Sequence, residues 1–520
     1  MTKKLKNIWL IPALAMAITS CSQDDDKYIG GSVMGGQTAL ASLYPVPPAQ
    51  WAGGESPYYS AGYVGDIMPY FDNGKFHIFF LHEAQNNPAG IGFHGIHEFE
   101  TTDMASFSYQ GEVLHYGGTN DADFAIGTGS VAKAGSTYYF YYSGHNENAA
   151  FLQDNPRQSV LCATSTNLKN WTKLPSFKIT APAGYSTFDF RDPQVFYNDE
   201  ENKYWMLVSA RTQPANTAVI LKFTTNDPAT GNWQAEGPLY TATAQENYLM
   251  MECPDLFKIG SYWYLVFSED WSGTKGTHYR MATTSNGPWT TPEHDMLDGE
   301  YFYAAKTASD GNNRYLFGWT ARKAPENDTG GKTWAGNMVT HELTQNADGT
   351  LAVKAPQAIA VRFSQSTQVA MESSAGSVSV TGNTYALNAG QETAIATFAN
   401  TGKKFRLNAK VTLGSNSGWA GFVFHTDADG HYYKIVFEPA QGRIAAYNST
   451  GQEVTRVPFN LEAGTAYNVE LITEGSICVL YVNGKVALSN RIYGRDNQKW
   501  GLIASGTGAT ITGLEVNKPQ

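Results

Sequence analysis

The chain has 520 residues, of which 13% are aromatic and only 16% are charged, and its formal net charge at pH 7 is −11. This length exceeds what one hydrophobic core usually organises, so it predicts two domains. The acidic balance argues against nucleic acid as a partner, because phosphate backbones are bound by basic surfaces, and it suits a neutral ligand such as a sugar.

The N-terminus has the pattern of a targeting segment. Three lysines lie among the first six residues, and the apolar run over 8–17 is too short to span a bilayer permanently. Cys21 then resembles the lipobox cysteine of bacterial lipoproteins, with a plain secretory signal and a chance cysteine as the alternative. We predict a lipoprotein signal peptide over 1–21, an acidic, flexible tether over 22–44, and lipid anchoring to the outer membrane, at the cell surface or facing the periplasm.

An aromatic-rich segment that follows a short turn recurs five times, about every 55 to 65 residues. The copies are 75–80, 137–142, 203–208, 261–266 and 314–319. A repeat of this length with several strands per unit is typical of β-propeller blades. The pattern therefore predicts an all-β fold that begins with a five-bladed β-propeller over 45–345, whose innermost strands line one axis.

Three carboxylates each precede a hydrophobic strand of this predicted propeller. Asp66 precedes the first aromatic repeat, Asp192 lies in an Arg-Asp-Pro string over 191–193, and Glu252 opens a Glu-Cys-Pro-Asp string over 252–255. Glycosidic bond cleavage needs such a set, because one group attacks or activates water, one donates a proton and one holds sugar hydroxyls. The alternatives are a turn residue at Asp66, a structural ion pair of Arg191 with Asp192 and a solvated charge at Glu252.

The C-terminal third has a different pattern. After a polar stretch and Pro356, short alternating strands predict a β-sandwich over 360–520. The Asn483-Gly484 pair lies between apolar runs and predicts a hairpin. No set of catalytic residue types converges in this region, so the sequence places the chemistry in the propeller.

The motifs in their order resemble those of glycoside hydrolase family 32, the β-fructofuranosidase, invertase and fructanase family. The strings that carry the resemblance are Arg-Asp-Pro over 191–193, Glu-Cys over 252–253, Tyr-Phe-Tyr-Ala-Ala-Lys over 301–306 and Phe-Gly-Trp over 317–319. The resemblance covers nearly the whole mature chain. It implies a five-bladed β-propeller followed by a C-terminal β-sandwich, and a hydrolase without cofactor or metal.

The resemblance also implies a role for each carboxylate in a retaining reaction. Asp66 would be the nucleophile, Glu252 the acid and base, and Asp192 a transition-state stabiliser that Arg191 keeps ionised. The string Gly-Asp-Ile-Met-Pro over 65–69 departs from the family's Asn-Asp-Pro-Asn motif. This departure puts the shape of the subsites, and so the identity of the substrate, in doubt more than it does the nucleophile.

Arg191 is also a candidate for substrate binding, and four further residues are weaker candidates for the same role. Asp123 and Thr128 lie in the second blade and either touch sugar hydroxyls or belong to a tight glycine turn. His82 follows the first aromatic strand, and it either contacts the sugar or has a structural role at the end of the strand. Trp319 would form a stacking wall, with a core tryptophan as the alternative.

The favoured function is release of fructose from β-fructofuranosides, which include the fructans levan and inulin, and sucrose. A second hypothesis is an arabinofuranosidase- or xylosidase-like enzyme on a five-bladed propeller, which would usually invert configuration. A third is a catalytically inactive, glycan-binding surface lipoprotein, which the altered motif at Asp66 supports. Fold alone does not choose among them.

Overall fold

The computed structural model describes residues 38–48, 62–84, 94–425 and 431–520. Strands dominate the described residues, and the one α-helix among them is the six-residue α1 (Gln357–Arg362). None of the helices in these ranges has the length and apolar character needed to cross a membrane. Cys21, the predicted signal peptide over 1–21 and the start of the predicted tether lie outside the described residues.

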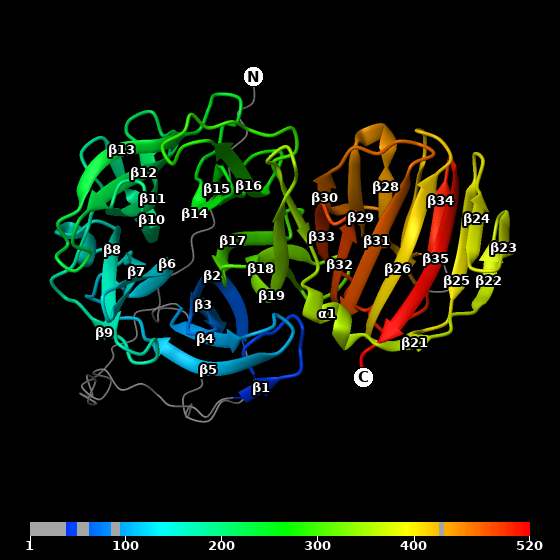
Figure 1. Cartoon of the computed structure of the whole chain (residues 1–520), viewed down its shortest axis with the longest axis horizontal. Helices are drawn as coiled ribbons and strands as arrows, with labels where there is room; N and C mark the ends of the chain where they lie inside the picture. The colour runs from blue at the N-terminus through cyan, green and yellow to red at the C-terminus, as the bar shows by residue number, and fades with distance from the viewer. Residues whose placement is uncertain (1–37, 49–61, 85–93, 426–430) are drawn as a thin grey trace, which may run out of the picture. The chain divides into compact units, whose positions relative to one another are not determined.

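The strands of residues 62–345 form antiparallel meanders, in which each strand pairs with the next along the chain (Figure 1). Their bounds are β2 (Gly62–Asp72), β3 (Lys75–Ala84), β4 (Ile96–Thr101), β5 (Phe107–Leu114), β6 (Ala125–Ala134), β7 (Thr137–His145), β8 (Gln158–Ser165), β9 (Thr172–Lys173), β10 (Tyr185–Asn198), β11 (Lys203–Thr212), β12 (Ala218–Thr225), β13 (Gln234–Thr241), β14 (Glu252–Ile259), β15 (Tyr262–Glu269), β16 (Gly276–Ala282), β17 (Phe302–Ser309), β18 (Arg314–Ala324) and β19 (Gly331–Gln345). The meanders are β2–β5, β6–β9, β10–β13, β14–β16 and β17–β19, and the single pair Gly336–Val64 joins the last to the first.

Each predicted aromatic segment is the second strand of one meander: β3, β7, β11, β15 or β18. These strands are apolar on both faces because each meander packs between two neighbours. In β3, for example, Phe76, Ile78 and Phe80 pack in one core cluster, whereas Phe79 and Leu81 pack in another with residues of β7. The uninterrupted aromatic runs therefore reflect burial on two sides.

The first strands of the meanders form a closed ring. β2 contacts β6, β6 contacts β10, β10 contacts β14, β14 contacts β17, and β17 returns to β2. Polar side chains tie neighbours together: the buried Asp255 of β14 accepts hydrogen bonds from Gln194 Nε2 of β10 (2.7 Å) and from Thr307 Oγ1 of β17 (2.6 Å). This ring is the arrangement expected around a propeller axis.

Every first strand carries a break in its ladder at an equivalent place. Pairing with the second strand shifts register between Val64 and Ile67 in β2, Gly127 and Gly129 in β6, Arg191 and Gln194 in β10, Glu252 and Asp255 in β14, and Tyr303 and Lys306 in β17. Such a bulge leaves residues unpaired and redirects their side chains.

The ordered structure begins earlier than the predicted propeller. β1 (Thr38–Leu40) pairs with β5, and Leu43 and Tyr44 are buried in a core cluster. Residues 38–44 therefore belong to the fold and not to the tether predicted over 22–44. The prediction missed this short apolar run because the segment before it is acidic. The run stabilises the domain, since β1 covers the edge of the sheet at β5 and the apolar side chains that follow are buried.

The C-terminal region is a β-sandwich, as predicted. One sheet has the order β23-β24-β35-β26-β31-β32-β33, with β21 beside β35, and the other has the order β22-β25-β34-β27-β28-β29-β30. The bounds are β21 (Gln365–Thr367), β22 (Met371–Ala375), β23 (Val378–Thr381), β24 (Thr384–Asn388), β25 (Thr393–Phe398), β26 (Lys404–Leu413), β27 (Trp419–Phe424), β28 (Tyr433–Glu438), β29 (Arg443–Tyr447), β30 (Glu453–Pro458), β31 (Ala466–Glu474), β32 (Ile477–Val482), β33 (Val486–Arg491), β34 (Trp500–Ser505) and β35 (Gly508–Lys518). The predicted hairpin joins β32 to β33, and Asn483 and Gly484 both have positive φ (54° and 62°).

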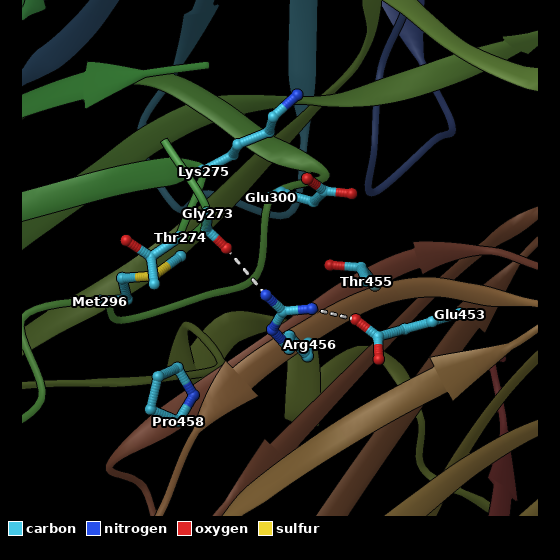
Figure 2. Close-up of a pocket in the computed structure, with 9 residues that line it drawn as sticks. All are labelled: Gly273, Thr274, Lys275, Met296, Glu300, Glu453, Thr455, Arg456 and Pro458. Carbon is cyan, nitrogen blue, oxygen red and sulfur yellow. Dashed lines mark hydrogen bonds and ion pairs between the residues drawn. The ribbon is translucent and has the colours of Figure 1, made fainter. Parts of the chain in front are cut away.

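Buried polar contacts join the sandwich to the meanders. Ser489 of β33 donates its backbone N–H to Asp298 (2.7 Å), and the buried guanidinium of Arg491 donates to the carbonyls of Thr320 and Ala321. Figure 2 shows a further contact beside a small cavity, where Arg456 of β30 donates to the Gly273 carbonyl (2.8 Å). β20 (Leu351–Lys354) pairs with β19 and precedes α1, so the chain leaves the propeller after residue 354.

Candidate active site

The ring of bulges builds a polar centre from one residue on each first strand: Asp66, Thr128, Asp192, Cys253 and Ala304. Three of these residues have positive φ, namely Asp192 (60°), Cys253 (53°) and Ala304 (52°). Residues other than glycine rarely adopt this backbone conformation, and those that do are concentrated at functional sites. The strain shows that the backbone at this level is held by the surrounding fold.

Cys253 lies at the middle of this centre. Its Sγ is 3.6 Å from Thr128 Oγ1 and 3.9 Å from both Asp66 Oδ2 and Asp192 Oδ2. Burial raises the pKa of the thiol well above its ordinary value, and the neighbouring carboxylates raise it further. Cys253 therefore stays a neutral thiol, and it marks the point where the predicted residues Asp66, Asp192 and Thr128 converge.

Two neutral donors hold the Asp66 carboxylate in one orientation. Thr128 Oγ1 donates to Oδ2 at 2.6 Å, and the indole N–H of Trp319 donates to Oδ1 at 3.0 Å. Burial raises the pKa of Asp66, while these two hydrogen bonds oppose the shift by stabilising the ionised form. The result is a fixed carboxylate whose charge is balanced by hydrogen bonds and not by a direct ion pair.

Asp192 is almost fully buried, at 3% exposed. Its Oδ2 accepts the backbone N–H of Cys253 at 3.0 Å, and its own backbone N–H donates to Ser143 Oγ at 2.7 Å. Burial raises the pKa of Asp192 to about 6; Glu252 and Asp66 add to the shift, and Arg191 opposes it. The protonation state of Asp192 therefore depends on the charges of Arg191, Glu252 and Asp66.

Arg191 makes its close ion pair with Glu252 and not with Asp192. Its Nη2 is 2.6 Å from Glu252 Oε1, whereas its Nε is 4.0 Å from Asp192 Oδ2. The Arg191 charge still opposes the rise in the Asp192 pKa, as expected, but its direct ion pair with Glu252 was not predicted. The reason is the bulge, which turns Asp192 toward the axis while Arg191 reaches the next first strand.

Glu252 is the first residue of β14 and remains 21% exposed, so it faces the open side of the centre. Besides Arg191, it has Tyr303 as a partner, whose hydroxyl donates to Oε2 at 2.7 Å. Burial and the Glu252 charge raise the pKa of Tyr303 well above its ordinary value, so this hydroxyl keeps its proton and remains a donor.

Trp319 fits the alternative of a core tryptophan and not that of a stacking wall, and it reaches the centre through its indole N–H. Its ring is 4% exposed and packs against Tyr303 (centroids 5.4 Å apart) and Trp334 (6.2 Å). Little of the ring is available as a stacking wall, and its contribution is the N–H bond to Asp66.

The structure holds the other two weak candidates in contacts within the blades. His82 is 5% exposed and stacks on His97 with ring centroids 4.2 Å apart, and burial lowers its pKa to about 3. Asp123 is also buried and accepts from Tyr142 (3.1 Å) and Lys173 (2.5 Å). These contacts favour the structural alternatives for both residues.

Sequence reasoning assigned no role to three residues that complete the centre: Tyr303, Ser143 and Lys306. Lys306 is buried and donates to the Gly129 carbonyl at 2.9 Å. Burial raises the pKa of both Asp66 and Asp255, and the charge of Lys306 opposes this rise. Tyr303 and Lys306 lie in the recognised string over 301–306, so their motif was visible. Ser143 was hidden, because it lies near the end of the aromatic strand β7 (Thr137–His145) and belongs to no motif.

The chemistry that this arrangement can perform is set by its asymmetry. Two neutral donors hold Asp66, whereas Glu252 is partly exposed and lies beside the Arg191 guanidinium and the Tyr303 phenol. Asp192 is buried and accepts the backbone N–H of Cys253. Paired carboxylates in unlike environments are the arrangement that separates a nucleophile from an acid and base. Among the described residues, the group of side chains spaced for a metal ion lies elsewhere, at His77, Glu98 and Glu100.

Two family models match the chain. Residues 65–356 match the glycosyl hydrolases family 32 N-terminal domain, and residues 349–516 match the GH32, BT1760-like, C-terminal domain. The first match covers the meanders from the Asp66 bulge onward, and the second covers the sandwich.

Relatives and solved structures agree with these matches. The raffinose invertase of Escherichia coli is 28% identical over 56% of this chain and 62% of its own, so the match spans under two thirds of that relative. The levanbiose-producing levanase of Bacillus subtilis is 22% identical over 85% of each chain. The sucrose-6-phosphate hydrolase structure from Lactobacillus gasseri superposes with a TM-score of 0.68, at 19% identity, over 90% of this chain and 94% of that one.

Proposed function

The chain belongs to glycosyl hydrolases family 32, and from that premise we propose that it is a retaining glycoside hydrolase that releases fructose from β-fructofuranosides. The observation that carries the proposal is the convergence of Asp66, Asp192 and Glu252 on the bulged ring around Cys253. Retention of all three carboxylates, each with its own hydrogen-bond partners, supports an enzyme over an inactive glycan-binding protein.

In the proposed first step, Asp66 attacks the anomeric carbon of a fructofuranosyl unit while the bond to the leaving oxygen breaks. The Thr128 and Trp319 bonds restrict rotation of the carboxylate, so less entropy is lost in reaching the attacking geometry. Glu252 gives its proton to the leaving oxygen. The product of this step is a fructosyl ester of Asp66 and a free leaving group.

In the second step, Glu252 takes a proton from water as the water oxygen attacks the same carbon and the bond to Asp66 breaks. Arg191 and Tyr303 fix Glu252 for both proton transfers, because each binds a different carboxyl oxygen. Asp192, ionised above its raised pKa, would accept sugar hydroxyls and favour the positive charge that develops on the ring in the transition state.

Two exposed aromatic rings on the acid's side of the centre support an extended substrate. Phe188 is 50% exposed and precedes Arg191 by three residues on β10, and Trp271 is 43% exposed just beyond β15, where Ser268 pairs with Glu252. The leaving group must lie beside the group that protonates it, so these rings would stack on its sugar units. We therefore propose a fructan, such as levan or inulin, as the preferred substrate over sucrose.

The purified protein should be assayed on levan, inulin, sucrose and an aryl arabinofuranoside, with the released sugars identified. The proposal expects fructose or short fructosides from a fructan, and NMR of the first product should show the retained anomer. Release of arabinose alone, or an inverted anomer, would instead favour the arabinofuranosidase-like hypothesis.

Phe188→Ala and Trp271→Ala test the fructan preference, with Tyr197→Ala as a matched control. Tyr197 is an equally exposed aromatic residue (46%) toward the other end of β10. Each of the first two variants should lose about 5-fold in kcat/KM on fructan, because it loses one stacking contact worth about 1 kcal/mol, and each should lose much less on sucrose. Equal losses on both substrates would remove the argument for an extended leaving-group site.

We also propose that the mature protein is a lipoprotein of the outer membrane, anchored through Cys21 and placed at the cell surface or facing the periplasm. The support is the lipobox-like sequence ending at Cys21 and the acidic residues that follow it. Cys21→Ala should move the protein from the membrane fraction to the soluble fraction. A variant that still sediments with membranes would contradict the anchor.

A further inference from the structure

A second cluster of titratable side chains lies in the first meander, away from the three carboxylates. His77 belongs to β3, and Glu98 and Glu100 belong to the neighbouring strand β4. His77 pairs directly with Glu100, and Glu98 is two residues further along the same strand. Since side chains alternate along a strand, this register places all three on one face of the sheet.

The three side chains are close together and shielded from water. His77 Nδ1 is 2.7 Å from Glu98 Oε1 and 3.9 Å from Glu100 Oε1, and one ligand atom from each residue lies within 4.8 Å of the others. His77, Glu98 and Glu100 are 7%, 0% and 6% exposed. A buried pair of carboxylates is costly unless each is paired with positive charge or fully hydrogen-bonded.

Glu100 meets that requirement, whereas Glu98 meets it through only one of its two oxygens. Lys75 (3.1 Å) and Lys169 (3.9 Å) approach Glu100 from the more exposed side of the cluster. Glu98 Oε2, by contrast, is buried without a hydrogen-bond partner among the described residues. Glu98 contacts His77 through Oε1. The oxygen without a partner, Oε2, is therefore the second oxygen of a carboxyl group that already belongs to the cluster.

We propose that His77, Glu98 and Glu100 bind a divalent metal ion of the Zn²⁺ type. One imidazole and two carboxylates form a common protein ligand set for zinc, with a water molecule in the fourth position. Small side-chain rotations would bring the three ligand atoms to about 2.0–2.2 Å from one ion. The ion would give Glu98 Oε2 the partner that it lacks and would join β3 to β4. Phe79 lies beside this cluster, because its ring stacks on His77 and packs against Trp171.

This role is structural and independent of the proposed function. The ligands contact none of the three carboxylates of the active site in the described hydrogen bonds and ion pairs, and they lie on the second and third strands of their meander. Bound metal therefore stabilises the folded protein by mass action, and its removal lowers thermal stability without changing the chemistry at Asp66.

The competing state is a proton in place of the metal. Burial raises the pKa of the Glu98 carboxyl, and a protonated Glu98 would satisfy part of the cluster. Glu98→Gln mimics this protonated form, and the variant should not bind metal. If a proton is the native partner of Glu98, the variant should be at least as stable as the wild-type protein.

The test uses chelator-treated full-length protein titrated with Zn²⁺, with Mn²⁺, Ca²⁺ and Mg²⁺ as comparison ions. We expect one Zn²⁺ per chain by calorimetry and a rise of about 5 °C in the unfolding midpoint at saturating metal. Glu98→Gln and Glu100→Gln should lose this rise. His145→Gln is the matched control, because His145 pairs with one glutamate (3.2 Å) and has no second one among the residues that the structure describes. The response of this variant to Zn²⁺ should equal that of wild type.

Two results would overturn the proposal. One is the absence of stoichiometric Zn²⁺ binding to the chelator-treated wild-type protein, a measurement that needs no variant to fold. The other is a midpoint shift that persists in both glutamine variants, because the ion would then bind elsewhere.

Discussion

The propeller and the sandwich are built from the same element, the antiparallel strand, yet they use it differently. In the propeller, all five first strands break their ladders at one level, and the freed residues face a common axis. In the sandwich, register shifts occur in separate pairs, β22–β25, β26–β35 and β29–β30, and share no axis. Bulges create a site only where the fold makes them coincide.

The two regions also bury different chemistry. The propeller axis holds Asp192, Asp255 and Lys306 at 5% exposure or less, at a cost that hydrogen bonds and opposite charges offset. The core between the two sheets of the sandwich is apolar, with Leu407, Phe422 and Leu480 among its members. Substitutions in the first region should therefore change activity, and substitutions in the second should change stability.

The largest effect is expected at Asp66. Asp66→Asn keeps the volume of the side chain but removes the nucleophilic charge, so turnover should fall by about 10⁴-fold or more. The free energy of unfolding should change little, which denaturant titration of the same preparation can check. Substantial residual turnover in a folded variant would show that another group attacks the sugar.

A core substitution in the sandwich should give the opposite result. Leu480 is fully buried in the sheet-to-sheet core, and Leu480→Ala should lower the free energy of unfolding by about 2–5 kcal/mol. Its kcat/KM per folded molecule, measured well below the unfolding midpoint, should equal that of wild type. Leu480→Met, which nearly conserves volume, serves as the control, and lost activity in both variants would mean that the sandwich contributes to the site.

Tyr303→Phe should give an intermediate effect confined to activity. The variant loses one hydrogen bond to the Glu252 carboxyl, worth about 1.5–3 kcal/mol for a charged acceptor. We expect kcat/KM on fructan to fall by about 10- to 100-fold. Tyr301→Phe, a buried tyrosine two residues earlier, should be nearly silent; similar losses in the two variants would argue that aromatic packing, and not the hydroxyl, matters.

The smallest effect concerns the pH dependence of stability. The folded-state pKa of Asp192 is about 6, and that of an unfolded aspartate is about 3.9. The folded protein therefore binds this proton more tightly, and its free energy of unfolding falls as pH rises from about 4 to 6. Asp192→Asn should remove about 1–3 kcal/mol of this decline. Denaturant titrations at the two pH values measure it, and parallel curves for wild type and variant would contradict the shift.

The sequence was most informative where a pattern follows directly from burial. The five aromatic strands, the sandwich strands and the Asn483-Gly484 turn were predictable, because sheets packed on two sides need apolar residues on both faces and tight hairpins need positive φ. The convergence of Asp66, Asp192 and Glu252 followed from placing each before an aromatic strand.

Other features depend on contacts between distant segments. The close ion pair of Arg191 with Glu252 results from the bulge in β10, which no local pattern encodes. The role of Trp319 as a donor to Asp66 depends on two strands that are 253 residues apart. The burial of Leu43 and Tyr44 was hidden by the acidic composition of the segment before them.

The central claim is that the bulged ring makes Asp66 the nucleophile, and a trapped intermediate tests it most directly. Glu252→Gln lacks the base for the second step, so it should accumulate the fructosyl ester when supplied with an activated aryl fructoside. After rapid denaturation and proteolysis, mass spectrometry should find one added dehydrated hexose on the peptide that contains Asp66. An adduct on Asp192, or aryl fructoside turnover with no adduct and an inverted product, would contradict the account.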